Sequence, residues 1–238
     1  MSAQAAYPGS ELDLFAGAAN WKQYWRSHVA RFVSGDVAEV GAGIGTNTGL
    51  LCHSERVRQW TCLEPDPRLA QRLRDSLGGG SGRCTIVVGT LEDVDAADRF
   101  DSVVYIDVLE HIDDDRAELR RAAGCLRPGG TLIVLAPAHQ WLFTAFDTAI
   151  GHYRRYTKGS LAAVVPPGFR MQELIYLDSV GLLASAANRF VLRSASPTAA
   201  QIKLWDRIFV TGSRLLDPLL GHSVGKSVLG IWRKDSST

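Results

Sequence analysis

The stretch VAEVGAGIGT, residues 37–46, decides the fold, because a short apolar run ends there in three closely spaced glycines. Glycines between a buried strand and a helix let the backbone approach a ligand, and the first turn of the helix offers free N–H groups. Glu39 is the acidic residue of this stretch, and a second one, Glu64, ends the next strand-like run. In a nucleotide-binding sheet this position reaches the ribose hydroxyls of a ligand that lies across the strand ends. The pattern is not a complete dinucleotide fingerprint, because Thr46 occupies the position of the last glycine in GxGxxG.

Strand-like and helix-like segments alternate on both sides of this stretch. Strands are predicted at residues 36–40, 59–66, 84–89, 100–107, 131–138, 169–179 and 224–234. Helices are predicted at residues 12–33, 49–56, 67–77 and 113–126. Strands that alternate with helices favour a parallel sheet covered by helices, so the predicted fold class is α/β.

The length of 238 residues suits one large domain, and we predict a single domain over residues 1–238. Residues 1–35 are expected to form an N-terminal helical cap on it. Residues 180–222 also look helical and amphipathic, with a break near residues 194–197. Because about forty residues before the last strand are too many for a bare loop, we interpret 180–222 as a helical insertion that serves as a lid or as an oligomer contact.

Composition and charge exclude several classes of protein. Apolar residues make up 46% of the chain and charged residues 21%, which is globular composition. Lys and Arg number 26 against 25 Asp and Glu, so we expect no nucleic-acid partner and no anionic membrane to dominate binding. The four cysteines form no CxxC pair and no pattern with the six histidines, so we predict reduced thiols and no metal site. Because no apolar run approaches the ~20 residues that span a bilayer and the first residues do not resemble a signal peptide, we predict a cytoplasmic protein without a membrane span.

Four motifs distinguish between the classes of nucleotide-binding sheet. They are EVGAGIGTNT at 39–48, LEPD at 63–66, FDSVVYIDVLEHIDDD at 100–115 and CLRPGGTLIV at 125–134. In this order they resemble the motifs of class I S-adenosylmethionine-dependent methyltransferases. The resemblance covers residues 37–136, and GHYRRYTKGSL at 151–161 is similar to a bacterial branch of small-molecule methyltransferases. It implies a Rossmann-like sheet of seven mostly parallel strands with helices on both faces and an antiparallel last strand, with S-adenosyl-L-methionine as cofactor and S-adenosyl-L-homocysteine as product.

The resemblance also implies which residues hold the cofactor. The loop after the first strand would line its methionine part, Glu64 would hold its ribose, and Asp107 would face the reaction centre. The family's usual adenine-binding Asp is replaced by Thr90, so the Leu91 backbone N–H or the Glu92 carboxylate would take its place. The full implied set is Glu39, Gly41, Ala42, Gly43, Glu64, Pro65, Thr90, Leu91, Glu92 and Asp107.

Three histidines and Asp107 are the candidate catalytic residues. A sulfonium methyl group is already a strong electrophile, so the protein mainly positions the nucleophile and excludes water. A weakly acidic O–H, N–H or C–H acceptor would also need a general base such as histidine. The candidates are His111, His139 and His152, because each lies near the expected carboxyl edge of the sheet. Each can equally be a packing or helix-capping residue, so the choice stays open.

The substrate-binding candidates are Tyr153, Arg154, Arg155, Trp21 and Trp141. Two arginines beside tyrosines can clamp a carboxylate or phosphate while the rings stack on the acceptor. The alternative is that both arginines pair with local acidic residues and that Thr157 caps the next helix. The two tryptophans are likewise either pocket wall or core.

These features predict an enzyme that transfers a methyl group to a small-molecule acceptor, with oxygen as the first expectation and carbon or nitrogen as the alternatives. An NAD-dependent oxidoreductase is disfavoured by Thr46, and a non-catalytic cofactor-binding protein by the intact Glu39 and Glu64. A nucleic-acid methyltransferase is disfavoured by the near-neutral charge and the absence of an NPPY-type motif, and a protein methyltransferase has no positive support. A homodimer is a further expectation, since dimers are common in this fold.

Overall fold

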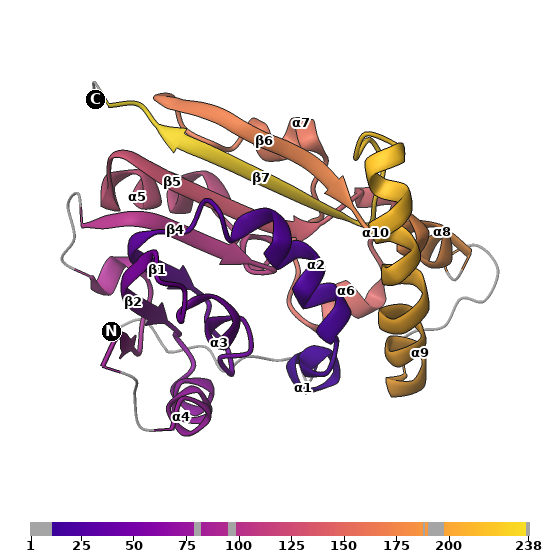
Figure 1. The fold of residues 1–238 in the computed structure, drawn as a ribbon, viewed down its shortest axis with the longest axis horizontal. Coiled ribbons are helices and arrows are strands. Elements are labelled where there is room, and N and C mark those ends of the chain that lie inside the picture. The colour runs from indigo at the N-terminus through magenta and orange to yellow at the C-terminus, as the bar shows by residue number, and fades with distance from the viewer. Residues whose placement is uncertain (1–10, 79–81, 95–98, 188, 190–197, 237–238) are drawn as a thin grey trace.

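The computed structural model describes residues 11–78, 82–94, 99–187, 189 and 198–236, and its centre is a seven-stranded sheet (Figure 1). The strands are β1 (Gly35–Val40), β2 (Val57–Leu63), β3 (Cys84–Val87), β4 (Phe100–Ile106), β5 (Leu126–Pro137), β6 (Phe169–Leu177) and β7 (Ser227–Lys234). Their spatial order is β3-β2-β1-β4-β5-β7-β6. Neighbours from β3 to β5 pair in parallel, whereas β7 is antiparallel to both β5 and β6. The predicted mostly parallel sheet with an antiparallel last strand is confirmed.

Helices cover both faces of the sheet, as predicted. The α-helices are α1 (Glu11–Ala16), α2 (Ala19–Val29), α3 (Thr48–Leu51), α4 (Pro67–Ser76), α5 (Asp115–Cys125), α6 (Ala145–Ala149), α7 (Lys158–Ala162), α8 (Ser179–Ala187), α9 (Ala199–Leu204) and α10 (Val210–Leu219), and a π-helical turn (Trp205–Phe209) joins the last two. Along β4, Val103 belongs to the hydrophobic cluster that contains Leu119 of α5, and Val104 to the cluster that contains Trp25 of α2. This alternation follows from the period of two with which strand side chains point to opposite faces.

The helix predicted at residues 12–33 is divided into α1 and α2 near Ala18. Ala18 has no side-chain acceptor for the free N–H groups that begin α2. The carboxylate of Asp206, in the π-helical turn, accepts hydrogen bonds from the N–H groups of Asn20 (3.2 Å) and Trp21 (2.8 Å) instead. A negative charge at this end also suits the helix dipole. The N-terminal helices are thereby fixed to the helical insertion, although the two are far apart in the sequence.

Two buried carboxylates attach the helical insertion to the rest of the domain. Asp217 of α10 accepts a hydrogen bond from the Tyr24 hydroxyl of α2 (2.7 Å) and another from the backbone N–H of Asp178 (2.7 Å). The carboxylate of Asp178 in turn accepts from the indole N–H of Trp205 (2.7 Å). Buried polar groups that are fully paired in this way hold elements in one arrangement. The break predicted at residues 194–197 lies outside the described residues.

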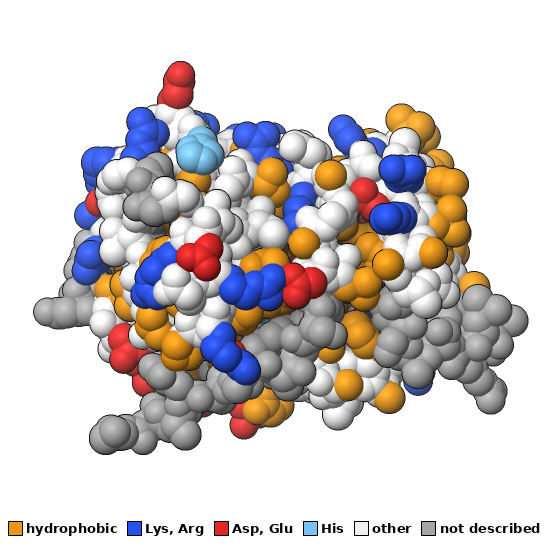
Figure 2. Space-filling view, turned by 90° about the horizontal axis from the view of Figure 1, so that it is seen from below, with side chains coloured by type: hydrophobic (Ala, Val, Ile, Leu, Met, Phe, Trp, Pro, Cys, Tyr) orange, Lys and Arg blue, Asp and Glu red, His pale blue; other side chains and the backbone are white. Residues whose placement is uncertain are grey.

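The same helices expose several large apolar side chains, next to the exposed charged residues Lys203, Arg207 and Arg214. The apolar ones are Leu204, Ile208, Leu215, Leu216, Leu219 and Leu220. Figure 2 shows apolar side chains at the end of the molecule where α9 and α10 lie, together with Lys and Arg side chains at the same end. The roles of residues 180–222 as a lid or an oligomer contact, and of residues 1–35 as a cap, stay predictions.

One helix end and one strand start differ from the predicted ones. The helix expected at residues 49–56 is the short α3, because the chain turns at Ser54, whose carbonyl accepts from the Val57 N–H (3.0 Å) at the start of β2. Helix α5 ends at Cys125 as expected, but the RPGG run at 127–130 continues as the beginning of β5 rather than as a loop.

Candidate active site

A cavity of about 230 Å³ lies at the carboxyl ends of β1, β4 and β5. Ligands of open α/β sheets bind at this edge. The walls come from α1 and α2, from the glycine loop (41–47), from the segments that follow β4 and β5, and from Trp205, Lys226 and Ser227. Of the residues predicted from the sequence, Trp21, Gly41, Ala42, Gly43, Asp107, His111, His152 and Arg155 line this cavity. The structure therefore brings together cofactor, catalytic and substrate candidates from segments that are far apart in the chain.

The glycine loop needs glycine because its backbone is left-handed and closely packed. Gly41 has a φ of +66°. A Cβ added there would lie 2.7 Å from a methyl carbon of Val108, which is closer than carbon atoms can pack. At Gly43, with a φ of +57°, an added Cβ would meet only Leu12 of α1, at 3.7 Å. The loop thus approaches the segment after β4 at one glycine and presents bare backbone at the other.

Glu64 lies directly behind this loop. Its carboxylate accepts hydrogen bonds from the backbone N–H groups of Gly43 (2.8 Å) and Asp66 (2.9 Å). Burial raises the pKa of Glu64, and these two hydrogen bonds oppose the shift. An ionised carboxylate offers about four acceptor positions, so acceptor capacity is left for a ligand. Neither Glu64 nor Pro65 is among the residues that line the cavity, so Glu64 reaches its edge only beside Gly43.

Glu39 lies inside the domain rather than in the cavity wall. Its carboxylate accepts from the Thr48 hydroxyl (2.5 Å) and from the indole N–H of Trp60 (2.8 Å). Burial raises the pKa of Glu39 to about 7, although both hydrogen bonds favour the ionised form. The side chain therefore connects β1 with α3 and β2. The sequence motif gave no indication that Thr48 and Trp60 would occupy this carboxylate.

Replacing Glu39 with glutamine is expected to change how stability depends on pH. The folded chain keeps the Glu39 proton up to about pH 7, whereas an unfolded chain loses it near 4.5, so this group's contribution to stability is full below pH 4.5 and is lost as the pH rises towards 7. This difference between the folded and unfolded pKa of Glu39 corresponds to about 3 kcal/mol in the free energy of unfolding. The free energy of unfolding of Glu39→Gln, from urea titrations, should therefore gain about 3 kcal/mol relative to the wild type between pH 4.5 and 8. A difference that is independent of pH would contradict this assignment.

The residues expected near the adenine lie at the end of β3, outside the cavity wall. The Thr90 hydroxyl accepts from the Glu92 N–H (3.2 Å) and caps a single 3₁₀ turn. Leu91 is buried, and the Glu92 carboxylate pairs with Arg121. The Asp expected at position 90 is found three residues later, where Asp93 accepts from the Thr90 N–H (2.8 Å). The side chains of Thr90 and Glu92 are therefore occupied by local partners.

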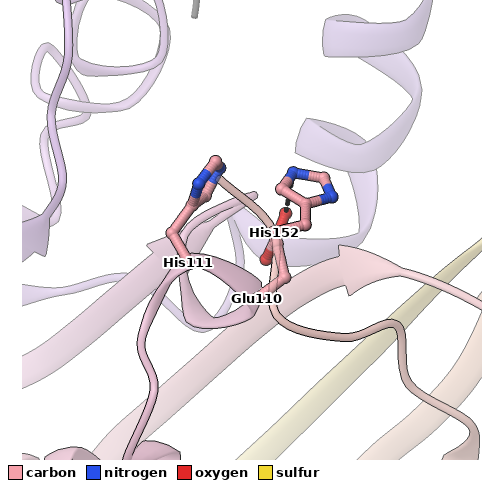
Figure 3. Close-up of side chains that lie close together, drawn as sticks. All are labelled: Glu110, His111 and His152. Atoms are coloured by element: carbon pink, nitrogen blue, oxygen red, sulfur yellow. Dashed lines mark ion pairs between the residues drawn. The ribbon is translucent and has the colours of Figure 1, made fainter. Parts of the chain in front are cut away.

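A cluster of ionisable side chains forms the part of the cavity wall next to the carboxyl end of β4. Asp107 lines the cavity with a φ of +54°, and burial raises its pKa to about 6 against the opposing effects of His152 and Lys226. Glu110 is only 1% exposed, and burial, together with the charge of Asp107, raises its pKa well above the ordinary value. Burial and the neighbouring His152 lower the pKa of His111 to about 4. Figure 3 shows Glu110, His111 and His152 pointing towards one another.

His152 is held by Asp147, a residue that the sequence analysis did not single out. The buried Asp147 carboxylate accepts from His152 Nδ1 (3.0 Å) and from Arg155 Nε (2.7 Å). Although burial raises the pKa of Asp147, the hydrogen bonds from His152 and Arg155 outweigh it and hold the pKa below the ordinary value. Because a carboxylate only accepts, Nδ1 carries the proton and Nε2 faces Glu110, 3.8 Å from its Oε1. The Thr144-to-Asp147 capping box that begins α6 is the sequence signal that could have indicated this residue.

Four other predicted site residues lie outside the cavity wall. His139 Nε2 is 3.0 Å from the Gly225 carbonyl, and its ring packs on Tyr176. Trp141 and Tyr153 are 45% and 55% exposed. Arg154 donates to the Ile112 carbonyl (2.7 Å) and pairs with Asp115 (3.0 Å). These contacts use the polar atoms through which His139 and Arg154 would have bound a substrate.

The alternative interpretation of the two arginines agrees with these contacts. Arg154 pairs with Asp115, and Arg155 with Asp147, so both are engaged by acidic residues near them in space. Thr157 caps α7, as that interpretation expected. Arg155 still lines the cavity and is the one arginine of this pair that can approach a ligand there.

Lys226 and Trp205 are cavity residues that the sequence analysis missed. The Lys226 ammonium lies 4.1 Å from the centre of the Trp205 ring. Burial lowers the pKa of Lys226, while Asp178 and Asp107 oppose the shift. Because both residues lie in the C-terminal third, where no motif matched, only the packing of the helical insertion on the sheet reveals them.

The strand order, the glycine loop and the position of the cavity define a class I methyltransferase fold. Residues 38–134 match the methyltransferase domain family. This match covers less than half of the chain, and over these residues the chain is similar to methyltransferase domains. None of the helices in the described part of the chain has the length and apolar composition that crossing a membrane requires.

The chain is similar to enzymes named ubiquinone biosynthesis O-methyltransferase. It is 33% identical to the one from Bradyrhizobium sp. (strain ORS 278) over 104 residues, which are 41% of this chain and 40% of the relative. It is 30% identical to the one from Xanthomonas campestris pv. campestris (strain B100) over 152 residues, 56% of this chain and 63% of the relative. The chain thus matches less than two thirds of the length of these relatives.

Solved structures share the fold. Phosphoethanolamine N-methyltransferase 2 from Haemonchus contortus, in complex with S-adenosyl-L-methionine, is 15% identical with a TM-score of 0.64, covering 97% of this chain and 60% of that one. The N-methyltransferase NodS from Bradyrhizobium japonicum WM9, in complex with S-adenosyl-L-homocysteine, is 15% identical with a TM-score of 0.57, covering 97% of this chain and 94% of that one. At these identities the likeness establishes the fold alone.

Proposed function

We propose that the chain transfers a methyl group from S-adenosyl-L-methionine to an oxygen of a small-molecule acceptor. The observation that carries the proposal is that the glycine loop and the His152–Asp147 pair meet at one cavity on the carboxyl edge of the sheet. The O-methyltransferase names of the relatives support oxygen over nitrogen or carbon as the methylated atom.

The residues around the glycine loop fit the cofactor. Gly43 presents bare backbone, and Glu64 has acceptor capacity left for ribose hydroxyls beside it. When bound, the cofactor supplies an electrophilic methyl group on its sulfonium. The apolar wall that Trp21 contributes from α2 would exclude water from the reacting atoms.

Both predicted accessory segments contribute residues to the wall of the cavity. Its volume of about 230 Å³ is below the roughly 300–1,000 Å³ of most small-molecule sites. Cofactor and acceptor together would therefore require it to open. Trp21 from the N-terminal helices and Trp205 from the helical insertion both line it, so we propose that these two segments act together as its cover. Their connection through Asp206 is consistent with joint movement.

His152 is the best-placed general base. Asp147 fixes the ring with Nδ1–H donated away from the cavity, which leaves the Nε2 lone pair available to an acceptor hydroxyl. A methyl acceptor of low acidity, such as a phenol or an alcohol, needs this help. Arg155 and Lys226 add positive charge to the same cavity and would favour an acceptor that carries or develops negative charge.

The experiment that tests the function compares two cofactor classes. Calorimetric titration should show one site per chain for S-adenosyl-L-homocysteine and no binding of NAD. With S-adenosyl-L-methionine present, phenolic acceptors should gain the mass of one methylene group while S-adenosyl-L-homocysteine is released. Binding of NAD without binding of S-adenosyl-L-homocysteine would overturn the proposal in favour of an oxidoreductase.

A further inference from the structure

Glu110 is an unusual residue, because its carboxylate is buried without a hydrogen-bond partner. Among the described residues, four buried side-chain atoms lack a partner, and two of them are the oxygens of Glu110. The side chain is 1% exposed. A buried carboxylate without a hydrogen bond is costly, whether it stays ionised or is forced to take up a proton. Such a group is expected to be retained only where something else binds it.

Two imidazole rings converge on the same carboxylate. One ligand atom from each of Glu110, His111 and His152 lies within 4.8 Å of the other two. The two rings are nearly perpendicular, with centres 4.4 Å apart, and Figure 3 shows the three side chains lying close together. A metal ion with bonds of about 2.1 Å holds neighbouring ligand atoms about 3–3.5 Å apart. Side-chain rotations within the cluster would suffice to reach that spacing.

The surroundings of His152 support a role as a metal ligand. Its second ring nitrogen, Nδ1, is bound by the buried Asp147 carboxylate at 3.0 Å. Metal-binding histidines almost always donate their other N–H to such a group, which fixes the tautomer and orients the ring. The three side chains lie at one side of the cavity, which they also line.

We propose that Glu110, His111 and His152 bind a divalent transition-metal ion whose free coordination positions face the cavity. Two imidazole nitrogens and one carboxylate suit Zn²⁺, Mn²⁺ or Fe²⁺ better than Mg²⁺ or Ca²⁺, which prefer oxygen ligands. The ion also explains the buried carboxylate, because its charge compensates that of Glu110. The sequence analysis predicted no metal site, since His152 lies 41 positions after His111 and the spacing matches no metal motif.

The proposed metal site restricts which methyl acceptors the cavity would favour. This inference about the acceptor rests on the proposed function. An ion at the cavity wall would bind an acceptor oxygen directly and lower the pKa of its hydroxyl group, so that the proton passes to water and the oxyanion is held by the ion. In the metal-bound protein, Nε2 of His152 is a ligand and no longer a base. Acceptors with two neighbouring oxygens, which can chelate the ion, would then be preferred over simple alcohols.

The test is a metal titration of the chelator-treated full chain. Free Mn²⁺, followed by electron paramagnetic resonance, should be depleted with one ion per chain, and Zn²⁺ should compete for the same site. Glu110→Gln and His111→Gln should each weaken Mn²⁺ binding at least about 100-fold, and Asp147→Asn by about 10- to 100-fold. His53→Gln is the matched control, because His53 is exposed and outside the cavity, and it should bind like the wild type.

The outcomes separate this inference from the proposed function. Absence of saturable Mn²⁺ and Zn²⁺ binding, or full binding by Glu110→Gln, would overturn the metal site. Calorimetry with S-adenosyl-L-homocysteine on the same samples reports the cofactor site independently, and it verifies that each variant is folded. If a variant does not fold, anomalous scattering from wild-type crystals soaked in Zn²⁺ decides the matter. An ion peak between the three side chains supports the site, and no peak there overturns it.

Discussion

Replacing Glu64 with alanine is expected to weaken binding of S-adenosyl-L-homocysteine at least about 100-fold, because hydrogen bonds to a charged group contribute about 1.5–3 kcal/mol each. Two effects combine in this variant. The ribose hydroxyls lose their carboxylate acceptor, and the Gly43 N–H loses the partner that holds the glycine loop at 2.8 Å. Isothermal titration calorimetry of the wild type and the variant measures the ratio directly.

Two further variants sharpen this test. Glu64→Gln keeps one acceptor for Gly43 and should lose less affinity than Glu64→Ala, which separates loop support from the charge. Glu92→Ala is the matched control at the same edge of the sheet. Its carboxylate is 66% exposed and paired with Arg121 rather than with the glycine loop, so affinity should change less than about threefold. Unchanged affinity in Glu64→Ala would contradict the ribose role, and a large loss in Glu92→Ala would restore that residue as an adenine ligand.

The sheet could be predicted because its information is local. The glycine loop, the β-branched runs and the capping acids each act over a few residues, and the parallel order follows once strands and helices alternate. The resemblance to the methyltransferase motifs placed Gly41, Gly43 and Asp107 at the cofactor site, and all three line the cavity. It could not show that the Glu39 carboxylate is occupied by Trp60, because that bond connects two strands through tertiary packing.

The parts that escaped prediction are those in which distant segments share one polar group. Asp206 caps α2 from 185 positions along the chain, and Asp217 binds Tyr24 across 193. No periodicity or capping rule identifies such partners. The same holds for Lys226 and Trp205, which become cavity residues only because the helical insertion packs against α2. A non-local hydrogen bond leaves no pattern in a single sequence, whereas its energetic weight in the buried site is large.

Replacing His152 with alanine is expected to lower kcat by about 100- to 10,000-fold, the range over which general acid–base groups contribute. The affinity for S-adenosyl-L-homocysteine should change little, because His152 lies beside Glu110 and Asp147 rather than at the glycine loop. The combination of lost turnover and retained cofactor binding distinguishes a role in activating the acceptor from simple unfolding. Steady-state kinetics with a phenolic acceptor, together with calorimetry, provides both readouts.

His139→Ala is the matched control, since the sequence nominated both histidines and the structure separates them. His139 bonds the Gly225 carbonyl outside the cavity wall, so its loss should affect stability more than turnover. Full activity of the His152→Ala variant would contradict both proposed roles of His152, as a base and as a ligand of a metal ion needed for activity. An inactive His152→Ala variant whose wild-type parent is unaffected by chelators would instead favour the base. The response to chelators therefore decides between two roles of Nε2. It either accepts the proton of the acceptor hydroxyl, or it binds a metal ion that activates this hydroxyl.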